Sequence, residues 1–159
     1  MKKLLLLTFL AAAVFMNACH EEIQADTALS GEWAYVGNFD HRTDVICMVC
    51  PGFKYDSSLY KLTFHADRTI TGKVNLLNMG GYYVTSEMEK AGKESKGTIK
   101  ISKFNATNKP YETEKDIKFQ QDFRWAMSYH VSVEATGLYD FLSVQYNENE
   151  YLFFVRKKK

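Results

Sequence analysis

The chain has 159 residues, of which 46% are hydrophobic and 14% aromatic, and its 20 basic and 19 acidic side chains leave a formal net charge of +1. This near-neutral balance excludes an electrostatic nucleic-acid binder. The length suits one domain of roughly 130 residues after a leader segment, which is enough to bury a core.

The first eighteen residues predict a cleaved export signal. Lys2 and Lys3 form a positive start, residues 4–15 are apolar but short for a transmembrane helix, and Ala18 stands directly before Cys19. The arrangement resembles the bacterial lipoprotein signal, which implies that the Cys19 thiol is joined to diacylglycerol and the chain is cut before it. Stable anchoring would need two or three acyl chains, because one chain binds a membrane only marginally. An ordinary secretory signal with a chance cysteine is the alternative.

Cleavage would remove two lysines and leave 18 basic against 19 acidic side chains, a net charge of −1. The acidic pair Glu21-Glu22 resembles the surface-export signal of some Gram-negative lipoproteins, although a solvated tether explains it equally well. We therefore expect an exported outer-membrane lipoprotein, facing either the periplasm or the exterior. Residues 19–29 lack apolar periodicity and predict a flexible stalk, so the folded domain is expected to span 30–159.

Period-two alternation of apolar residues predicts strands over most of the domain. Residues 59–65 and 69–75 should form a hairpin, and 79–84 the next strand, entered through glycines. Residues 87–96 are charged and predict a loop or one weak helical turn. Residues 98–102 return to a strand.

A helix is predicted over 111–127, because acidic residues at its start suit a helix N-terminus. Four apolar side chains recur at helical spacing and should face a sheet: Phe119, Phe123, Ala126 and Met127. Trp125 falls off that stripe. Residues 129–135 are expected to form another strand, and 139–146 with 151–156 a last hairpin.

Together these elements predict a mainly β (α+β) domain. We expect a strongly curved antiparallel sheet or partly open barrel of about eight strands, with one helix packed near the C-terminal third. Strands and helices do not alternate, which argues against a parallel nucleotide-binding sheet. The ten Tyr, eleven Phe and two Trp are interpreted mostly as core, because a small curved sheet needs bulky inward rings.

Several short motifs occur in a fixed order along the domain. They include Trp33, Gly72, Asn75, Gly80, Gly81, Tyr82 and Arg156. Their order resembles the META domain, the family of the heat-shock lipoprotein HslJ, over residues 29–156, and the resemblance implies that these positions are structural. The resemblance implies an envelope β domain without an established reaction. Val74 departs from it, because many members have cysteine there, and so does the insertion that holds Cys47 and Cys50.

The Gly31-Glu32-Trp33 segment also resembles the Gly-x-Trp opening of lipocalin-like barrels. In that family the tryptophan packs under a late basic residue, here Arg156, by a cation–π contact. This second resemblance implies a carrier of a small apolar ligand, which needs a sizeable apolar cavity open at one barrel end.

Cys47 and Cys50 are the leading candidates for chemistry, since they are the thiols left once Cys19 is lipidated. We favour a structural disulfide, as expected of an exported protein. A redox pair is less favoured because no helix follows the motif. A zinc site with His41 and His65 is the third reading, although the histidines lie at no recognised spacing.

No nucleophile elbow, phosphate-binding glycine loop or His-Glu-x-x-His motif is present in the sequence. His65 and His130 fall on outward strand positions, and Glu87, Glu89 and Glu94 suit a solvated surface. We therefore expect no catalytic, metal or cofactor site, and no enzyme.

The sequence favours a lipid-anchored, non-catalytic envelope protein of META type, with a binding or envelope-maintenance role. The alternatives are a lipocalin-like carrier and an inhibitor of a secreted enzyme such as lysozyme, for which residues 38–58 offer the contact loop. Expected partners are the membrane, through the anchor, and a protein or small apolar ligand, with no nucleic acid. We expect a monomer.

Overall fold

The computed structural model describes residues 25–42, 45–46, 60–106 and 112–158. The elements are β1 (Gly31–Asp40), β2 (Val45–Ile46), β3 (Tyr60–Phe64), β4 (Thr69–Val74), β5 (Leu77–Ala91), β6 (Glu94–Ala106), α2 (Glu114–Arg124), β7 (Ser128–Val133), β8 (Tyr139–Gln145) and β9 (Glu150–Lys157). No helix among these residues is long and apolar enough to cross a membrane.

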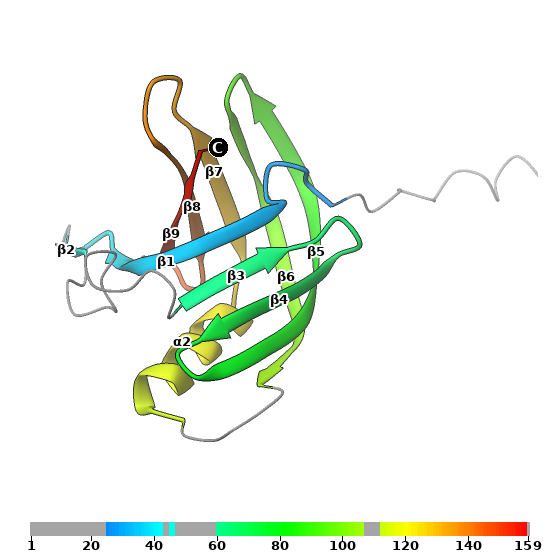
Figure 1. Ribbon diagram of the computed structural model, residues 1–159. Coiled ribbons are helices and arrows are strands. Elements are labelled where there is room, and N and C mark those ends of the chain that lie inside the picture. The colour runs from blue at the N-terminus through cyan, green and yellow to red at the C-terminus, as the bar shows by residue number, and fades with distance from the viewer. Residues whose placement is uncertain (1–24, 43–44, 47–59, 107–111, 159) are drawn as a thin grey trace, which may run out of the picture.

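The strands form one antiparallel sheet that closes into a barrel (Figure 1). Its order is β2-β1-β3-β4-β5-β6-β7-β8-β9, and β1 also pairs with β9. That additional pairing joins the first and last long strands, from Ala34 opposite Val155 to Asp40 opposite Glu150. Eight strands therefore make the barrel, and β2 extends it beside β1. Within the described residues, the prediction of a mainly β, barrel-like fold with one helix is confirmed.

The predicted hairpins are present with the predicted facing. Tyr60, Leu62 and Phe64 of β3 are buried, and the strand pairs with β4 from Tyr60 opposite Val74 to Phe64 opposite Ile70. The last hairpin pairs Gln145 with Tyr151 and continues to the far ends of β8 and β9. Alternation of apolar residues identified these strands because each has one face in the core.

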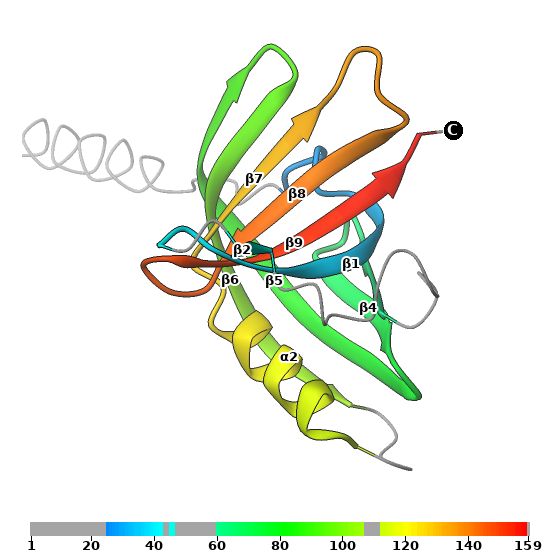
Figure 2. The ribbon, with the colours of Figure 1, turned by 90° about the vertical axis from the view of Figure 1, so that its left-hand side faces the viewer.

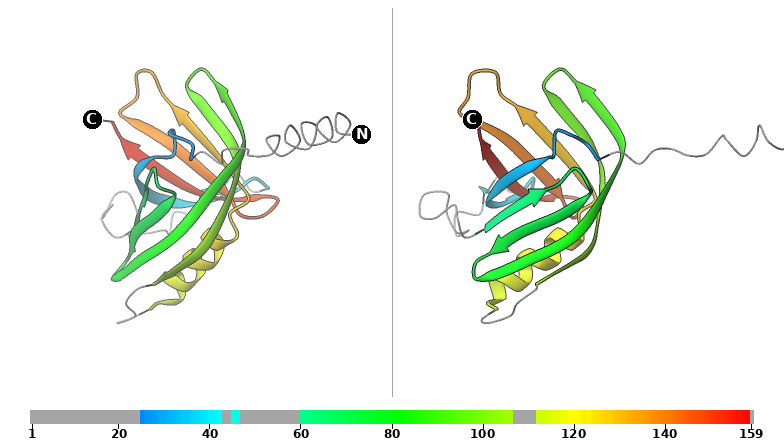
Figure 3. Two further views of the ribbon diagram at one scale, coloured as in Figure 1. Left: turned by 90° about the vertical axis from the view of Figure 1, so that its right-hand side faces the viewer. Right: turned by 45° about the vertical axis from the view of Figure 1, so that its right-hand side comes forward.

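The expectation of a loop over residues 87–96 is wrong. Strand β5 continues to Ala91 and β6 begins at Glu94, so the chain turns at Gly92, where φ is +59°. Figure 3 shows this hairpin running the height of the barrel. The side chains from Ser86 to Glu94 are exposed, so both faces meet water and apolar alternation disappears although backbone pairing persists.

Helix α2 is shorter than predicted but faces as predicted. The Thr113 side chain accepts from the backbone of Asp116, and the Asp116 carboxylate accepts from the backbone of Thr113, which fixes the start. Phe119, Phe123 and Ala126 are buried, and Trp125 is 73% exposed. Met127 is 54% exposed, so its predicted inward facing is wrong. It lies beyond the helix, in extended backbone that bonds to β6 and β8.

The two ends of the barrel are closed by different segments. Helix α2 lies across one end, as Figure 2 shows, and the segment before β1 crosses the other (Figure 1). Asp26 and Leu29 of that segment are buried, so the prediction of a flexible stalk is wrong for residues 25–29. Sequence periodicity missed the segment because it has too few apolar residues to set a pattern.

Candidate functional site

The barrel lumen is filled by aromatic side chains from the strands and from α2. The Phe123 ring centroid lies 4.8 Å from that of Phe104 and 6.2 Å from that of Phe64. The Phe119 ring lies 4.9 Å from Tyr35 and 5.5 Å from Tyr60, in edge-on contacts that aromatic pairs favour. The lumen therefore serves as the core of the protein.

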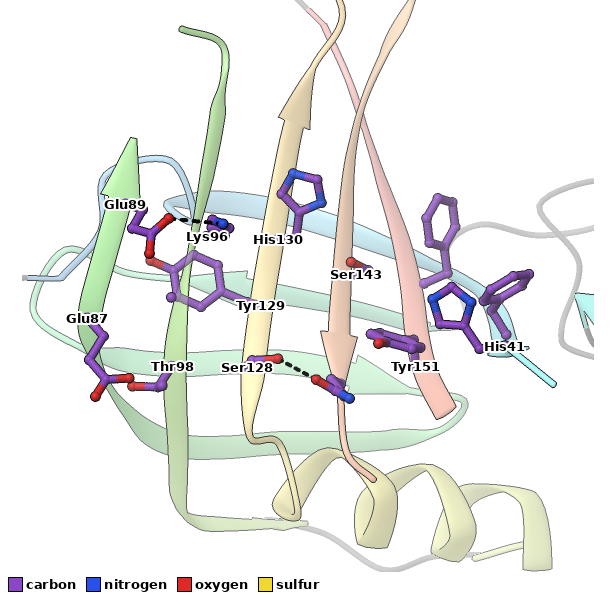
Figure 4. Close-up of a pocket in the computed structure, with 14 residues that line it drawn as sticks. His41, Glu87, Glu89, Lys96, Thr98, Ser128, Tyr129, His130, Ser143 and Tyr151 are labelled. Atoms are coloured by element: carbon purple, nitrogen blue, oxygen red, sulfur yellow. Dashed lines mark hydrogen bonds and ion pairs between the residues drawn. The ribbon is translucent and has the colours of Figure 1, made fainter. Parts of the chain in front are cut away.

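A groove of about 710 Å³ lies on the outside of the barrel (Figure 4). Its lining residues come from six neighbouring strands: β5, β6, β7, β8, β9 and β1. Ser128 and His130 line it, and they alternate with the buried Tyr129 and Val131 on β7. Because alternate residues of a strand point to opposite faces, the groove occupies the outer face of the sheet. Two smaller surface hollows have volumes of about 570 and 360 Å³.

One end of the groove is aromatic. Phe39 on β1 stands opposite Tyr151 on β9, and Phe153 lies two residues further along β9. The His41 ring centroid lies 5.3 Å from that of Phe39 and 5.2 Å from that of Tyr151, both edge-on. Phe153 also stacks on Phe141 at 5.9 Å. These contacts hold several ring faces at the surface.

The middle of the groove is lined by hydroxyl and amide groups. The Ser128 hydroxyl donates to the side-chain carbonyl of Gln145 at 2.8 Å, and the Gln145 amide donates to the backbone carbonyl of Glu148 at 3.3 Å. The Thr98 and Ser86 hydroxyls bond to each other at 2.6 Å. Each of these groups retains hydrogen-bonding capacity for a ligand.

The other end carries two carboxylates and an ammonium group. Glu89 pairs with Lys96 at 2.9 Å across the β5–β6 hairpin. Glu87 lies in a β-bulge between Ser86 and Glu89, and its φ is +53°. A left-handed conformation costs a non-glycine residue about 1–2 kcal/mol. Lys96 offsets one of the two carboxylates, so this end of the groove keeps one negative charge.

Trp33 and Arg156 form the predicted contact. The Arg156 guanidinium carbon lies 4.2 Å from the centre of the Trp33 ring, and its Nη1 donates to the Ser30 carbonyl at 2.8 Å. The Trp33 indole donates to the Leu29 carbonyl at 2.7 Å. Asp140 accepts from two guanidinium nitrogens at 3.1 and 2.9 Å. These contacts hold the N-terminal segment against the barrel.

The other motif positions lie outside the groove. A Cβ at Gly72 would approach a β3 backbone carbonyl to 2.5 Å, and one at Gly81 would approach the Phe104 Cα to 2.9 Å. Asn75 has φ +56° in the β4–β5 turn. Gly80 and Tyr82 line the shallow hollow of about 360 Å³. These positions shape the barrel wall.

Besides Asp140, two carboxylates are buried, Asp26 and Asp116, and the sequence did not predict that either would be. Burial alone raises the pKa of Asp26, but hydrogen bonds from Ser95, the Ala28 backbone and Tyr129 outweigh it and hold that pKa below its usual value. The Lys90 ammonium lies 3.3 Å from the same carboxylate. Asp26 thus fastens the N-terminal segment to β6 and β7. The burial of Asp26 could not be predicted from the sequence, because a lone acidic residue in a polar segment resembles a solvent-exposed one.

Asp116 has the corresponding role at the α2 end. Burial raises its pKa, while hydrogen bonds from Tyr60, Thr113 and Asn75 outweigh this and lower it below the usual value. The Asn75 amide donates to Asp116 at 3.5 Å, so this motif residue helps to tie α2 to the barrel.

Comparison with family models gives no match, and comparison with curated proteins gives none either. Among solved structures, the chain is similar to the crystal structure of a DUF4847 family protein from Bacteroides vulgatus ATCC 8482. The TM-score is 0.52 and the identity 18%, over 84% of this chain and 98% of that one. The likeness lies in the fold alone. It carries no information about the META resemblance.

The cysteine predictions concern residues outside the described part of the chain: Cys19, Cys47 and Cys50. The disulfide, redox and zinc readings therefore stay predictions. The His65 Nε2 lies 2.7 Å from the Thr71 hydroxyl, whereas His41 packs between aromatic rings in the groove. Within the described ranges, no three His, Cys, Asp or Glu side chains gather as a metal site.

Proposed function

We propose that this chain is an exported, lipid-anchored protein of the cell envelope that acts as a non-enzymatic binding module. Its partner sits in the outer groove and not in the lumen. The observation that carries this proposal is the contrast between a lumen packed with rings and an outer groove of about 710 Å³. Ligand sites commonly have volumes of about 300–1,000 Å³ and mix apolar walls with a few polar groups.

The sequence supports the proposed location in the cell envelope. Residues 1–18 have the pattern of a lipoprotein signal, and Cys19 is the acceptor that this pattern implies. The META resemblance points to the same compartment. A rigid barrel on a membrane anchor would hold the groove at the envelope surface.

The lipocalin-like carrier is the competing reading, and the Trp33–Arg156 contact gives it some support. However, such a carrier holds its ligand inside the barrel, where Phe119 and Phe123 fill the space. The enzyme-inhibitor reading depended on residues 38–58, which lie mostly outside the described residues.

The anchor is tested with Cys19→Ser. The unchanged chain should incorporate a palmitate analogue during growth and sediment with membranes, whereas the variant should do neither. Incorporation by Cys19→Ser would contradict the proposed anchor.

The location of the binding site is tested with a fluorescent fatty acid. Titrated into the purified full chain, this probe should show no saturable binding. Saturable binding that persists in Tyr151→Ala, a groove variant, would favour the lumen carrier and refute the proposal.

A further inference from the structure

We infer that the outer groove binds a neutral saccharide chain, which stacks on the rings of its aromatic end and donates hydroxyl protons to the Glu87 carboxylate. This inference rests on the proposed function, because it names the ligand class of the same groove. Four features of the groove support it: backbone strain, length, charge and the chemistry of its lining.

The strain is at Glu87. The φ of Glu87, +53°, lies in the left-handed region, and Glu87 lines the groove from a β-bulge. Such conformations cost free energy and gather at binding sites, where bulges often redirect a side chain. Glycine would remove the strain at Glu87 but would also remove the carboxylate from the groove.

The length of the groove suits a chain. Its lining residues span five intervals between neighbouring strands, each about 4.8 Å, or roughly 24 Å along the sheet. The strands beneath it are paired with neighbours on both sides, so a peptide cannot bind here by adding a strand to an open edge. A ligand on this face must be recognised through side chains.

The charges favour a neutral ligand. Glu89 is paired with Lys96, and the His130 Nε2 lies 3.6 Å from the Glu94 carboxylate. The carboxylates oppose a polyanion, whereas the Lys96 ammonium reduces the attraction for a basic peptide. Neither kind of charged polymer complements this surface.

The lining groups match those of a sugar. The negative faces of Phe39, Tyr151 and Phe153 complement the C–H hydrogens on one face of a pyranose ring. Glu87 accepts hydrogen bonds, and the hydroxyl and amide side chains both donate and accept them. An acyl chain would cover these polar groups without using their remaining hydrogen-bonding capacity.

The experiment measures binding of the purified full chain to neutral oligosaccharides of increasing length by calorimetry. The variants are Tyr151→Ala, Glu87→Gly and Lys103→Gly, with circular dichroism and thermal unfolding as controls for folding. Lys103 is the matched control because its φ is +51° and it lies outside the groove.

We expect Glu87→Gly to be at least as stable as the unchanged protein yet to bind at least tenfold more weakly. Tyr151→Ala should weaken binding by a similar factor. Lys103→Gly should be at least as stable as the unchanged protein and bind normally. Affinity should rise with oligosaccharide length until the groove is filled.

Three outcomes would overturn the inference. Binding of no neutral oligosaccharide refutes the ligand class. Binding of extended peptides in place of sugars, lost in the same two variants, refutes the saccharide but leaves the groove as the binding site. Saccharide binding that neither variant weakens refutes the groove itself, and with it the proposed function.

Discussion

Replacing Phe123 with alanine should remove much of the packing free energy that holds α2 in the end of the barrel. The side chain is fully buried and its ring meets Phe64, Phe104 and Phe154 at centroid distances of 6.2, 4.8 and 6.4 Å. The structure therefore predicts a large loss of stability from one substitution far from the groove.

The magnitude follows from the buried area. A buried aromatic side chain covers about 150–250 Å², which at about 25 cal/mol per Å² gives an upper estimate of roughly 4–6 kcal/mol. Phe→Ala substitutions in cores cost about 3–5 kcal/mol. We therefore expect Phe123→Ala to lower the free energy of unfolding by about 4 kcal/mol.

The assay is urea unfolding of the full chain followed by far-ultraviolet circular dichroism. With a slope of about 2 kcal/mol per molar urea, the midpoint should fall by about 2 M. Trp125→Ala is the matched control, because this side chain follows the same helix and is 73% exposed. Its effect should stay within about 0.5 kcal/mol.

A loss below about 1 kcal/mol for Phe123→Ala would refute the reasoning, because it would mean that the ring does not fill the lumen. A larger effect at Trp125 than at Phe123 would reverse the inferred facing of the helix. The substitution should also create an apolar cavity, since engineered cavities of this kind bind small apolar molecules. Binding of benzene by the variant and not by the unchanged protein would report that cavity.

Three further substitutions test the barrel wall and its N-terminal closure. Gly72→Ala should cost about 1–3 kcal/mol in urea unfolding, because its Cβ would lie 2.5 Å from a β3 carbonyl oxygen; an unchanged midpoint would contradict this. Arg156→Leu should lower the free energy of unfolding by about 2 kcal/mol, because it removes the guanidinium from Trp33 and from the carbonyl of Ser30. It should also speed hydrogen exchange in the segment before β1, and unchanged exchange there would contradict the role of Arg156 in holding that segment. The pKa of Asp26 is lowered in the folded state, so its stabilisation is fully present above the unfolded value of about 4 and is lost as the pH falls through the lower folded value. As the pH falls from about 5 to about 2, the free energy of unfolding should therefore decrease less for the Asp26→Asn variant than for the unchanged protein. Parallel curves of stability against pH for the two proteins would contradict this role of Asp26.

The sequence by itself determined where strands with one face in water and one face in the core would form, and which face would be buried. Tyr60, Leu62 and Phe64 alternate, and Phe119 with Phe123 recur at helical spacing, so each pattern records which side of its element is buried. The barrel class and helix α2 follow from these local patterns.

Only the tertiary structure decided how the ends of the chain meet. The pairing of β1 with β9 closes the barrel, and no local pattern identifies a partner more than a hundred residues away. The same holds for Asp26, whose burial depends on hydroxyls supplied by Ser95 and Tyr129. A polar side chain can be buried only where distant segments provide its hydrogen bonds.

The groove was also hidden from the sequence. Phe39, Tyr151 and Ser128 occupy outward positions on three different strands, and they line one surface because the barrel places those strands in one half of its wall. Glu87 looked like part of a charged loop, since its left-handed backbone arises from a bulge in a paired hairpin. Periodicity records which face of an element meets water, whereas a binding surface depends on which outward faces become neighbours after the sheet has closed.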